Sequence, residues 1–234
     1  NELQTALITA SVDATTGTPY AWTIPDAIGS SLRVRVTNNG DTSVADISDA
    51  NFKIVGSFTL TSPNGGETWA VGTAQNITWT KVGNITNAKL EYTTNDFTTT
   101  TLIATSTSAG ALAYSWTVAD TVSSAVKVRI SDSTDATVFD NSNATFRIRV
   151  AWTLTAPNGG EQWLVGNSYS MTWSQAGTIS NAKLEYSRDN FAADVRLISA
   201  AAPTGSGGGT YVWTIPDSIS ATVKVRVSDP NDAP

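Results

Sequence analysis

The chain has 234 residues, of which 40% are hydrophobic and only 15% are charged, and its formal net charge is −6. Nucleic-acid binding calls for a basic surface, so this acidic balance excludes that class of function. The sequence contains no cysteine and no histidine. Disulfides, thiol catalysis and cysteine-ligated metals are therefore excluded, and the commonest general base and zinc ligand are missing. No apolar run has the roughly 18 residues of a membrane span, so we expect no insertion into a membrane.

A phrase built around tryptophan occurs three times, as YAWTIPD from Tyr20, YSWTVAD from Tyr114 and YVWTIPD from Tyr211. The first two copies are 114 − 20 = 94 residues apart, and the third follows after 211 − 114 = 97 residues. The three additional residues fall in the glycine run at 205–209. Self-similarity at a fixed period is typical of repeat architectures, so we expect folded units of about 94 residues.

The ends of the chain do not coincide with the ends of the predicted repeats. Residues 58–150 match one complete repeat, whereas residues 1–57 match only its C-terminal part. Residues 151–234 match a repeat that lacks its last strand. Because the sequence begins at Asn1, we expect it to be a window from a longer precursor.

Short runs of alternating apolar and polar residues, separated by turn residues, predict strands throughout the complete repeat. An Asn-Gly pair within residues 63–66 predicts a tight hairpin, because both residues adopt positive φ readily. We therefore predict an all-β protein of tandem antiparallel β-sandwiches, immunoglobulin-like or fibronectin type III-like, with Trp79, Tyr92 and Trp116 in the core. The eight predicted strands are Phe58–Thr61, Thr68–Val71, Asn76–Thr80, Ala88–Thr93, Thr101–Thr105, Tyr114–Val118, Ala125–Ser131 and Thr145–Val150.

The boundary between the second and third repeats has no glycine- or proline-rich spacer, because residues 146–150 lead directly into residues 151–154. So short a connection limits hinge motion, and we expect a stiff rod. Phe58 and Trp152 occupy equivalent places at the two boundaries, where an aromatic side chain can pack between neighbours.

Repeated sequence motifs lie at Pro63–Gly72, Ile77–Thr80, Lys89–Tyr92, Trp116–Asp120, Val126–Asp132 and Asp140–Phe146. Together they resemble the Ig-like repeats of large bacterial surface and secreted proteins. More distantly, they resemble the N-terminal Ig-like module of the fungal Kre9/Knh1 cell-wall family. The resemblance implies a spacer or wall-associated module, and no reaction. The central repeat departs from its neighbours at Ala119, where they have Pro25 and Pro216.

Charged residues alternate with apolar ones in the strands predicted around residues 89, 127 and 147. In an immunoglobulin topology these strands are neighbours, so their charges form a ladder on the outer face. The ladder is a candidate interaction face for acidic glycans or a neighbouring filament. The alternative is a solvated face with cross-strand ion pairs of about 0.2–1 kcal/mol each. The residues of the ladder are Lys89, Glu91, Lys127, Arg129, Arg147 and Arg149.

Asp132, Asp135 and Asp140 are weak candidates for a Ca²⁺ site, because calcium takes six to eight oxygen ligands. No loop has the fixed aspartate spacing of a calcium motif, and turns use Asp in any case. We therefore expect no cofactor other than this weakly indicated ion.

Three tryptophans outside the predicted core strands, Trp69, Trp152 and Trp163, are candidates either for glycan contact or for packing at the boundaries. No catalytic constellation is visible in the sequence. Glu67 and Glu161 recur in the repeat, but each follows a Gly-Gly pair and is expected to cap backbone amides.

These observations predict a non-enzymatic structural segment of a large extracellular or cell-surface protein, namely a stalk, an adhesin shaft or a filament. The alternative is a carbohydrate-binding accessory module of a secreted, wall-associated protein. The expected partners are neighbouring repeats of the same protein and, in the alternative, cell-wall glycans. A sandwich that lacks its last strand exposes an edge, so copies of the chain are further candidate partners, by strand complementation in a filament.

Overall fold

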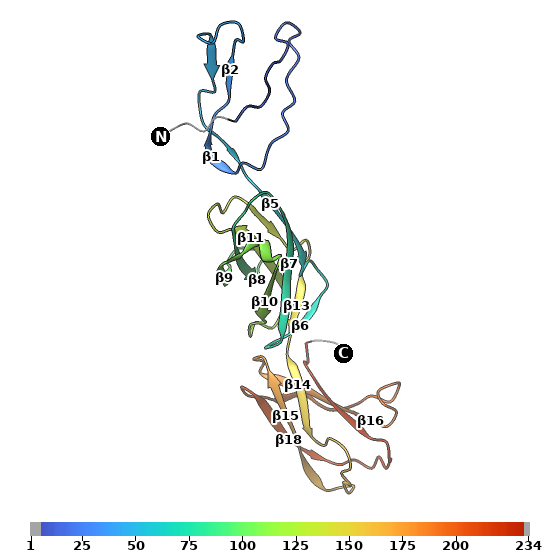
Figure 1. The fold of residues 1–234 in the computed structure, drawn as a ribbon. Coiled ribbons are helices and arrows are strands. Elements are labelled where there is room, and N and C mark those ends of the chain that lie inside the picture. Colours follow the sequence, from blue (N-terminus) through green and yellow to red (C-terminus); the bar gives the residue numbers. More distant parts are fainter. Residues whose placement is uncertain (1–5, 232–234) are drawn as a thin grey trace.

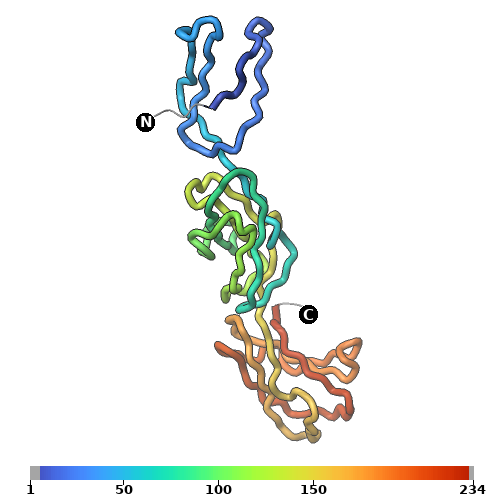
Figure 2. Tube along the Cα trace, in the orientation of Figure 1, coloured from blue at the N-terminus to red at the C-terminus, as the bar shows by residue number. Residues whose placement is uncertain are grey.

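The computed structural model describes residues 6–231, which form an elongated molecule of three units placed one after another (Figures 1 and 2). Each sheet is built from strands of a single unit. We call residues 6–56 the N-terminal unit, residues 57–150 the central unit and residues 151–231 the C-terminal unit. No helix in this described part of the chain is long and apolar enough to cross a membrane.

The central unit is an antiparallel β-sandwich, as the sequence predicts. One sheet has the order β10-β7-β5, and the other has the order β6-β13-β11-β8-β9, with β12 paired to β11. Only the contact between β6 and β13 is parallel. This arrangement is the Greek-key topology of immunoglobulin-like and fibronectin type III-like domains. The strands are β5 (Ser57–Ser62), β6 (Thr68–Ala70), β7 (Ala74–Val82), β8 (Asn87–Thr93), β9 (Thr101–Ser108), β10 (Ala113–Thr117), β11 (Ser123–Asp132), β12 (Phe139–Asn141) and β13 (Phe146–Arg149), and a 3-10 turn spans Ala109–Ala111.

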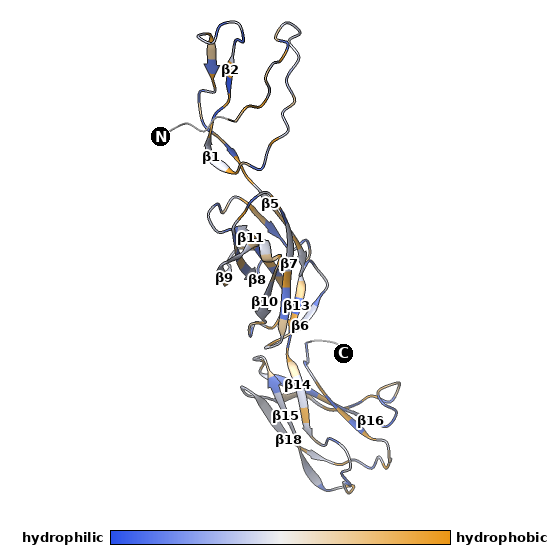
Figure 3. Ribbon diagram, in the orientation of Figure 1, coloured by the Kyte–Doolittle hydropathy of each residue, from blue (hydrophilic) through white to orange (hydrophobic). Residues whose placement is uncertain are grey.

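All eight strands predicted for this unit are present, and β12 is an addition that the sequence pattern did not indicate. Alternation along β7 places Ile77 and Trp79 in the core and polar residues outside. Figure 3 shows both hydrophobic and hydrophilic colours along this strand. Trp79 is 2% exposed, and its indole N–H donates to the carbonyl of Ala109 at 3.0 Å. Tyr92 and Trp116 are also buried, so the predicted core residues are confirmed.

The turn at residues 63–66 differs from the prediction. Gly65 and Gly66 have the expected positive φ values of 131° and 85°. However, the turn leads from β5 in one sheet to β6 in the other, so it is a crossing between sheets and no hairpin. The carboxylate of Glu67 accepts the backbone N–H groups of Asn64 and Gly65, both at 2.8 Å. Glu161 accepts the equivalent pair in the next unit, which confirms the predicted capping role of both glutamates.

The C-terminal unit repeats most of this sandwich. Its sheets are β14-β15-β18 and β17-β16-β19, and its core contains Met171, Trp173 and Leu184. Residues 162–164, which correspond to β6, form no strand, and no described strand pairs with the second edge of β19. The strands are β14 (Ala151–Ala156), β15 (Ser168–Ala176), β16 (Asn181–Ser187), β17 (Arg196–Pro203), β18 (Gly208–Thr214) and β19 (Lys224–Ser228).

The N-terminal unit contains four short strands in two separate pairs, β1 with β4 and β2 with β3. Its core is small: Ile54 is the one buried hydrophobic residue among its described positions. Trp22 meets Phe52 edge-on, with ring centroids 6.3 Å apart. The strands are β1 (Gly29–Leu32), β2 (Arg35–Thr37), β3 (Ala45–Ile47) and β4 (Phe52–Ile54).

Candidate functional site at the junctions between units

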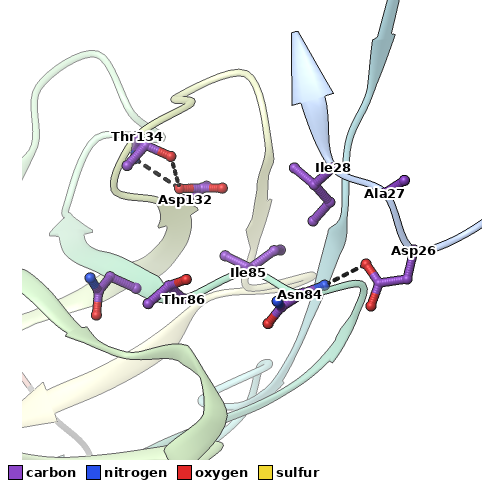
Figure 4. A pocket seen from close by; sticks show the side chains of 9 residues that line it. Asp26, Ala27, Ile28, Asn84, Ile85, Thr86, Asp132 and Thr134 are labelled. Atoms are coloured by element: carbon purple, nitrogen blue, oxygen red, sulfur yellow. Dashed lines mark hydrogen bonds between the residues drawn. The ribbon is translucent and has the colours of Figure 1, made fainter. Parts of the chain in front are cut away.

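The first junction joins the aspartate that ends the tryptophan phrase to a glycine turn of the following unit. The backbone N–H of Asn84 donates to Oδ1 of Asp26 at 2.8 Å, as Figure 4 shows. A tight turn presents this carboxylate, because the N–H of Ala27 donates to the carbonyl of Pro25 at 2.8 Å. The adjoining Gly83 has a φ of 87°, and a Cβ there would lie 3.2 Å from Ile28. The glycine therefore allows the two units to approach closely.

The second junction is built in the same way. Asp120 accepts two hydrogen bonds from Thr178, one from its backbone N–H at 2.8 Å and one from its hydroxyl at 2.6 Å. The preceding Gly177 has a φ of 109°, and a Cβ there would lie 3.1 Å from Val71 and 3.4 Å from Val122. Ala119, the position where the central repeat lacks proline, still forms the tight turn, with the N–H of Thr121 donating to its carbonyl at 2.8 Å.

The two junctions thus use equivalent residues at equal separations. The aspartate and its partner are 84 − 26 = 58 residues apart in the first junction and 178 − 120 = 58 residues apart in the second. Ile28 and Val122, which contact the glycines, are also equivalent in the repeat. Hydrogen bonds to charged groups contribute about 1.5–3 kcal/mol each, and less where solvent screens them, as at these exposed carboxylates. The same directional contact therefore joins neighbouring units at both junctions.

A salt bridge adds to the first junction, where Nζ of Lys53 lies 3.3 Å from Oδ2 of Asp135. Next to the Asp26 contact is an open hollow of about 390 Å³, lined by both units (Figure 4). Asp132 lines this hollow, but its Oδ1 already accepts both the N–H and the hydroxyl of Thr134, each at 2.8 Å. The hollow is therefore a polar gap between neighbouring units.

The sequence pattern did not indicate these junction aspartates, because the tryptophan phrase is typical of a core strand. The residues that the aspartates contact also lie far from them in the sequence. A signal was nevertheless present. An aspartate ends each tryptophan phrase, and Gly83 and Gly177 follow Asp26 and Asp120 after the same interval of 57 residues. Two residue types that recur with a fixed separation across a repeat boundary indicate contact between units.

The three aspartates proposed for calcium each serve a separate local role. Asp132 closes its own turn, and Asp140 accepts the backbone N–H of Leu60 at 2.7 Å. Hydrogen bonds from the side chain and backbone of Thr137, and then from Lys53, hold the pKa of Asp135 below its ordinary value. No group of three or more acidic, histidine or cysteine side chains gathers within residues 6–231. The three residues are therefore not brought together.

The charged ladder lies on the neighbouring strands β8, β11 and β13, as expected. Most of its members have partners within the unit. Nζ of Lys89 lies 2.8 Å from Oε1 of Glu91, and Nζ of Lys127 lies 2.8 Å from Oδ1 of Asp96. The guanidinium of Arg129 lies between the rings of Phe97 and Phe139 and donates to Asn141 at 2.9 Å. Arg147 is half-buried and Arg149 is exposed, both on β13.

The three candidate surface tryptophans do not form a common platform. Trp69 is buried in the core of the central unit, with its ring centroid 4.9 Å from that of Phe146, and so it offers no glycan contact. β6 lies beside β13, and this pairing covers the indole. Trp152 packs against the core of the C-terminal unit. Trp163 is half-buried in that unit. Its ring stacks on that of Tyr169, with ring centroids 4.9 Å apart and an interplanar angle of 3°.

An ion cluster centred on a buried glutamate lies inside the C-terminal unit. Glu185 is buried, with Nζ of Lys183 at 2.6 Å and Nη2 of Arg226 at 2.7 Å. Burial by itself raises the pKa of this carboxyl. The hydrogen bonds and charges of Lys183 and Arg226 outweigh that effect, and the pKa lies below its ordinary value.

We predict that acid weakens the C-terminal unit through Glu185. A carboxyl with a depressed folded-state pKa stabilises the fold above its unfolded-state pKa, and this contribution is lost as pH falls through the folded-state value. Urea unfolding of the wild type should therefore show decreasing stability below about pH 4. The decrease should be smaller in Glu185→Gln. Equal slopes in the two proteins would contradict this role.

No model of a known protein family matches the sequence, and no curated protein matches it either. Among solved structures, the fibronectin(III)-like modules of Clostridium thermocellum CbhA are 18% identical, with a TM-score of 0.27 over 75% of this chain and 87% of theirs. A chimeric titin Z1Z2-Z1Z2 tandem is 13% identical, with a TM-score of 0.24 over 74% of this chain and 92% of that one. These overlaps are weak, and the sandwich fold is established by the strand pairing of the chain itself.

Proposed function

We propose that this chain is a non-catalytic structural segment, a stalk or shaft of tandem β-sandwich units whose function is to hold a fixed length and direction. The observation that supports this most strongly is the repeated junction. There the carboxylates of Asp26 and Asp120 accept hydrogen bonds from the backbone N–H groups of Asn84 and Thr178, respectively. Independent domains joined by linkers have no need of such matched contacts.

The proposal includes the absence of catalysis. The sequence lacks histidine and cysteine, which carry out much general acid–base and nucleophilic chemistry. The recurring carboxylates of Glu67 and Glu161 are engaged by backbone amides of their own turns. The paired carboxylates of a glycosidase have to face one cleft. Glu67 and Glu161 belong to different units and cap separate turns.

We further propose an extracellular or cell-surface location for this segment. The sparse charge, the surface rich in Ser, Thr and Asn, and the resemblance of the repeated sequence motifs to bacterial surface repeats support it. The interaction partners that follow from this function are other units of the same kind.

The proposed function predicts that Asp120→Ala makes the second junction flexible. The substitution removes both hydrogen bonds to Thr178 but leaves the cores of the two units unchanged. Small-angle X-ray scattering of the wild type should give an extended particle of one length. Asp120→Ala should give a broader distribution that includes bent particles.

Asp217→Ala provides the matched control, because Asp217 ends the third tryptophan phrase and is exposed, and no other unit contacts it among residues 6–231. Its scattering should equal that of the wild type in dilute solution. A wild type that is already bent or freely jointed would contradict the proposed rod.

A further inference from the structure

β18 forms one edge of its sheet in the C-terminal unit, with β15 between it and β14 (Figure 1). Among residues 6–231, no strand pairs with the second side of β18. In the same described range, the equivalent strand β10 of the complete central unit pairs only with β7. The free edge is therefore a feature of the complete repeat.

The backbone groups of β18 alternate between β15 and the free side. The carbonyl of Gly207 accepts the N–H of Gln175 at 3.1 Å, and Ile215 exchanges two hydrogen bonds with the turn at residues 166–167, which leads into β15. Because this direction alternates along a strand, the odd-numbered residues bond to β15 and the even-numbered ones face away from it. The residues with N–H and C=O groups on the free side are Thr210, Val212 and Thr214.

β18 lacks the features that protect most edge strands. Natural edges carry charges, prolines or bulges, or are very short, and each of these opposes pairing with another chain. β18 has the sequence GGTYVWT over seven residues, without a charge or a proline, and its register with β15 is unbroken. Its Val212 is a β-branched residue that is 64% exposed. Such an edge is a template for the addition of a further strand.

Other edge strands of the two sandwiches are better protected. β17 begins with Arg196, ends with Pro203, and has two irregularities in its register with β16. β9 has two such irregularities, and β5 and β14 have one each. β10 has only five residues, with Ser115 at the place of Val212. Of these edges, β18 opposes pairing with another strand least.

The sequence of β18 is self-complementary. Read in either direction, residues 210–214 have the order Thr, aromatic, Val, aromatic, Thr. In two antiparallel copies centred on Val212, this residue faces its own counterpart, and Thr210 faces Thr214 of the second copy. These are the residues with outward backbone groups, so each facing pair exchanges two hydrogen bonds. Tyr211 and Trp213, on the core side, are then opposite each other, and pairs of aromatic or β-branched residues stabilise a sheet.

The outward face of β15 and β18 carries no charge that would oppose contact between copies. The hydroxyl groups of Ser168 and Thr214 already bond each other at 2.8 Å. The chain has a formal net charge of −6, so copies that approach through acidic surfaces repel each other. Contact along β18 avoids that repulsion. The neighbouring outward residues of β15 are Ser168, Ser170 and Thr172.

The opposite sheet leaves room for a second copy at this edge. β17 is the strand of that sheet next to β18. Its residues Ala200 and Ala201 are exposed, and neither has a long side chain that projects beyond the edge. The β17 strands of two paired copies can therefore lie near each other.

We propose that two copies of this chain pair through β18, antiparallel and related by a two-fold axis at Val212. The sheets β14-β15-β18 of both copies then form one continuous sheet. The contact is isologous, so each copy uses this edge once and the product is a dimer. The proposal goes beyond the stalk function, because it concerns the contact between two rods and a flexible chain would pair in the same way.

Cysteine cross-linking tests the two-fold axis, since the chain has no cysteine of its own. In Val212→Cys the two thiols belong to a hydrogen-bonded pair, whose Cα atoms are about 5.5 Å apart and within the range of a disulfide. Mild oxidation should therefore give a covalent dimer. The matched control is Ser115→Cys, at the equivalent exposed position of β10, and it should stay monomeric. Equal cross-linking of both variants would overturn the proposal.

A mixture of two variants tests the register of the contact. Thr210→Cys and Thr214→Cys should each stay monomeric alone, because the two copies of either position lie about 13 Å apart in the proposed pairing. Mixed together, they should form a disulfide with each other. A mixture that gives no such product, or cross-linking of Thr210→Cys with itself, would contradict the proposed contact.

Sedimentation velocity shows whether the dimer forms without a covalent bond. The wild type should change from monomer to dimer as its concentration rises. Val212→Lys places two like charges opposite each other and should lower the association constant by about 100-fold. Ser115→Lys is the matched control and should leave association unchanged. Wild-type chains that remain monomeric at millimolar concentration, or equal losses in both variants, would refute the pairing.

The two proposals are tested on separate proteins. Val212 is exposed, so Val212→Lys should keep the folded state, as measured by tryptophan fluorescence. The stiffness of the rod is then measured on this monomeric variant. A jointed monomer would refute the stalk and leave the β18 contact standing, whereas a stiff monomer whose wild type does not pair would do the reverse.

Discussion

Phe146→Ala should destabilise the central unit by about 3–5 kcal/mol, the range for truncating a buried phenylalanine. Phe146 is 1% exposed and packs against Trp69 at the point where β13 covers the sandwich. Its loss leaves a cavity between β6, β11 and β13 that neighbouring side chains fill only in part. Hydrogen exchange measured by mass spectrometry on β8 and β11 peptides isolates the effect on this unit.

Phe52→Ala is the matched control for this substitution, because Phe52 is the equivalent residue in a unit without a closed core. It is half-buried, and its ring meets that of Trp22 edge-on at 6.3 Å. We expect its effect on exchange in the central unit to be negligible. A loss below about 1 kcal/mol for Phe146→Ala would contradict the burial of this side chain.

Gly177→Val should separate the central unit from the C-terminal unit. The glycine has a φ of 109°, and a Cβ at this position would lie 3.1 Å from Val71 and 3.4 Å from the Cα of Val150. A β-branched residue adds steric overlap with the neighbouring unit to a backbone strain of about 1–3 kcal/mol. The hydrogen bonds between Thr178 and Asp120 should therefore break, and the amide exchange of Thr178 should accelerate.

Gly166→Val separates strain from steric overlap, because Gly166 has a φ of 80° in the same unit and no atom within 4 Å of an added Cβ. It should lower the stability of the C-terminal unit by a similar strain energy, while the exchange of Thr178 stays as in the wild type. If both variants released Thr178 equally, the contact at Gly177 would have no part in holding the units together.

The sequence predicts the sandwich well because alternation and turn residues are local properties of the chain. All eight predicted strands of the central unit form, although β12 was missed because its three residues, Phe139–Asn141, lie in a stretch rich in turn residues. Whether the other strands form depends on which strands lie beside them. Thr68–Ala70 is a strand only because β13 lies beside it, and residues 162–164, where no such partner is described, form none.

The candidate site residues could not be placed from the sequence for the same reason, because their surroundings depend on segments distant in the chain. Trp69 was a surface candidate from its local sequence, yet parallel pairing of β6 with β13 buries it. The hairpin prediction at residues 63–66 failed because local turn chemistry does not determine which sheet the chain enters next. Asp26 and Asp120 act on partners 58 residues away, so their role emerges only when repeats are compared across a boundary.

The most direct test of the central claim, that the junctions fix the direction of the rod, is the measurement of residual dipolar couplings on the isotope-labelled wild-type chain. The Asp120–Thr178 hydrogen bonds and the close contact at Gly177 predict that one alignment tensor fits the amides of both the central and the C-terminal units. Two tensors of clearly different magnitude would show that the units reorient independently, and the account of a stiff rod would be wrong.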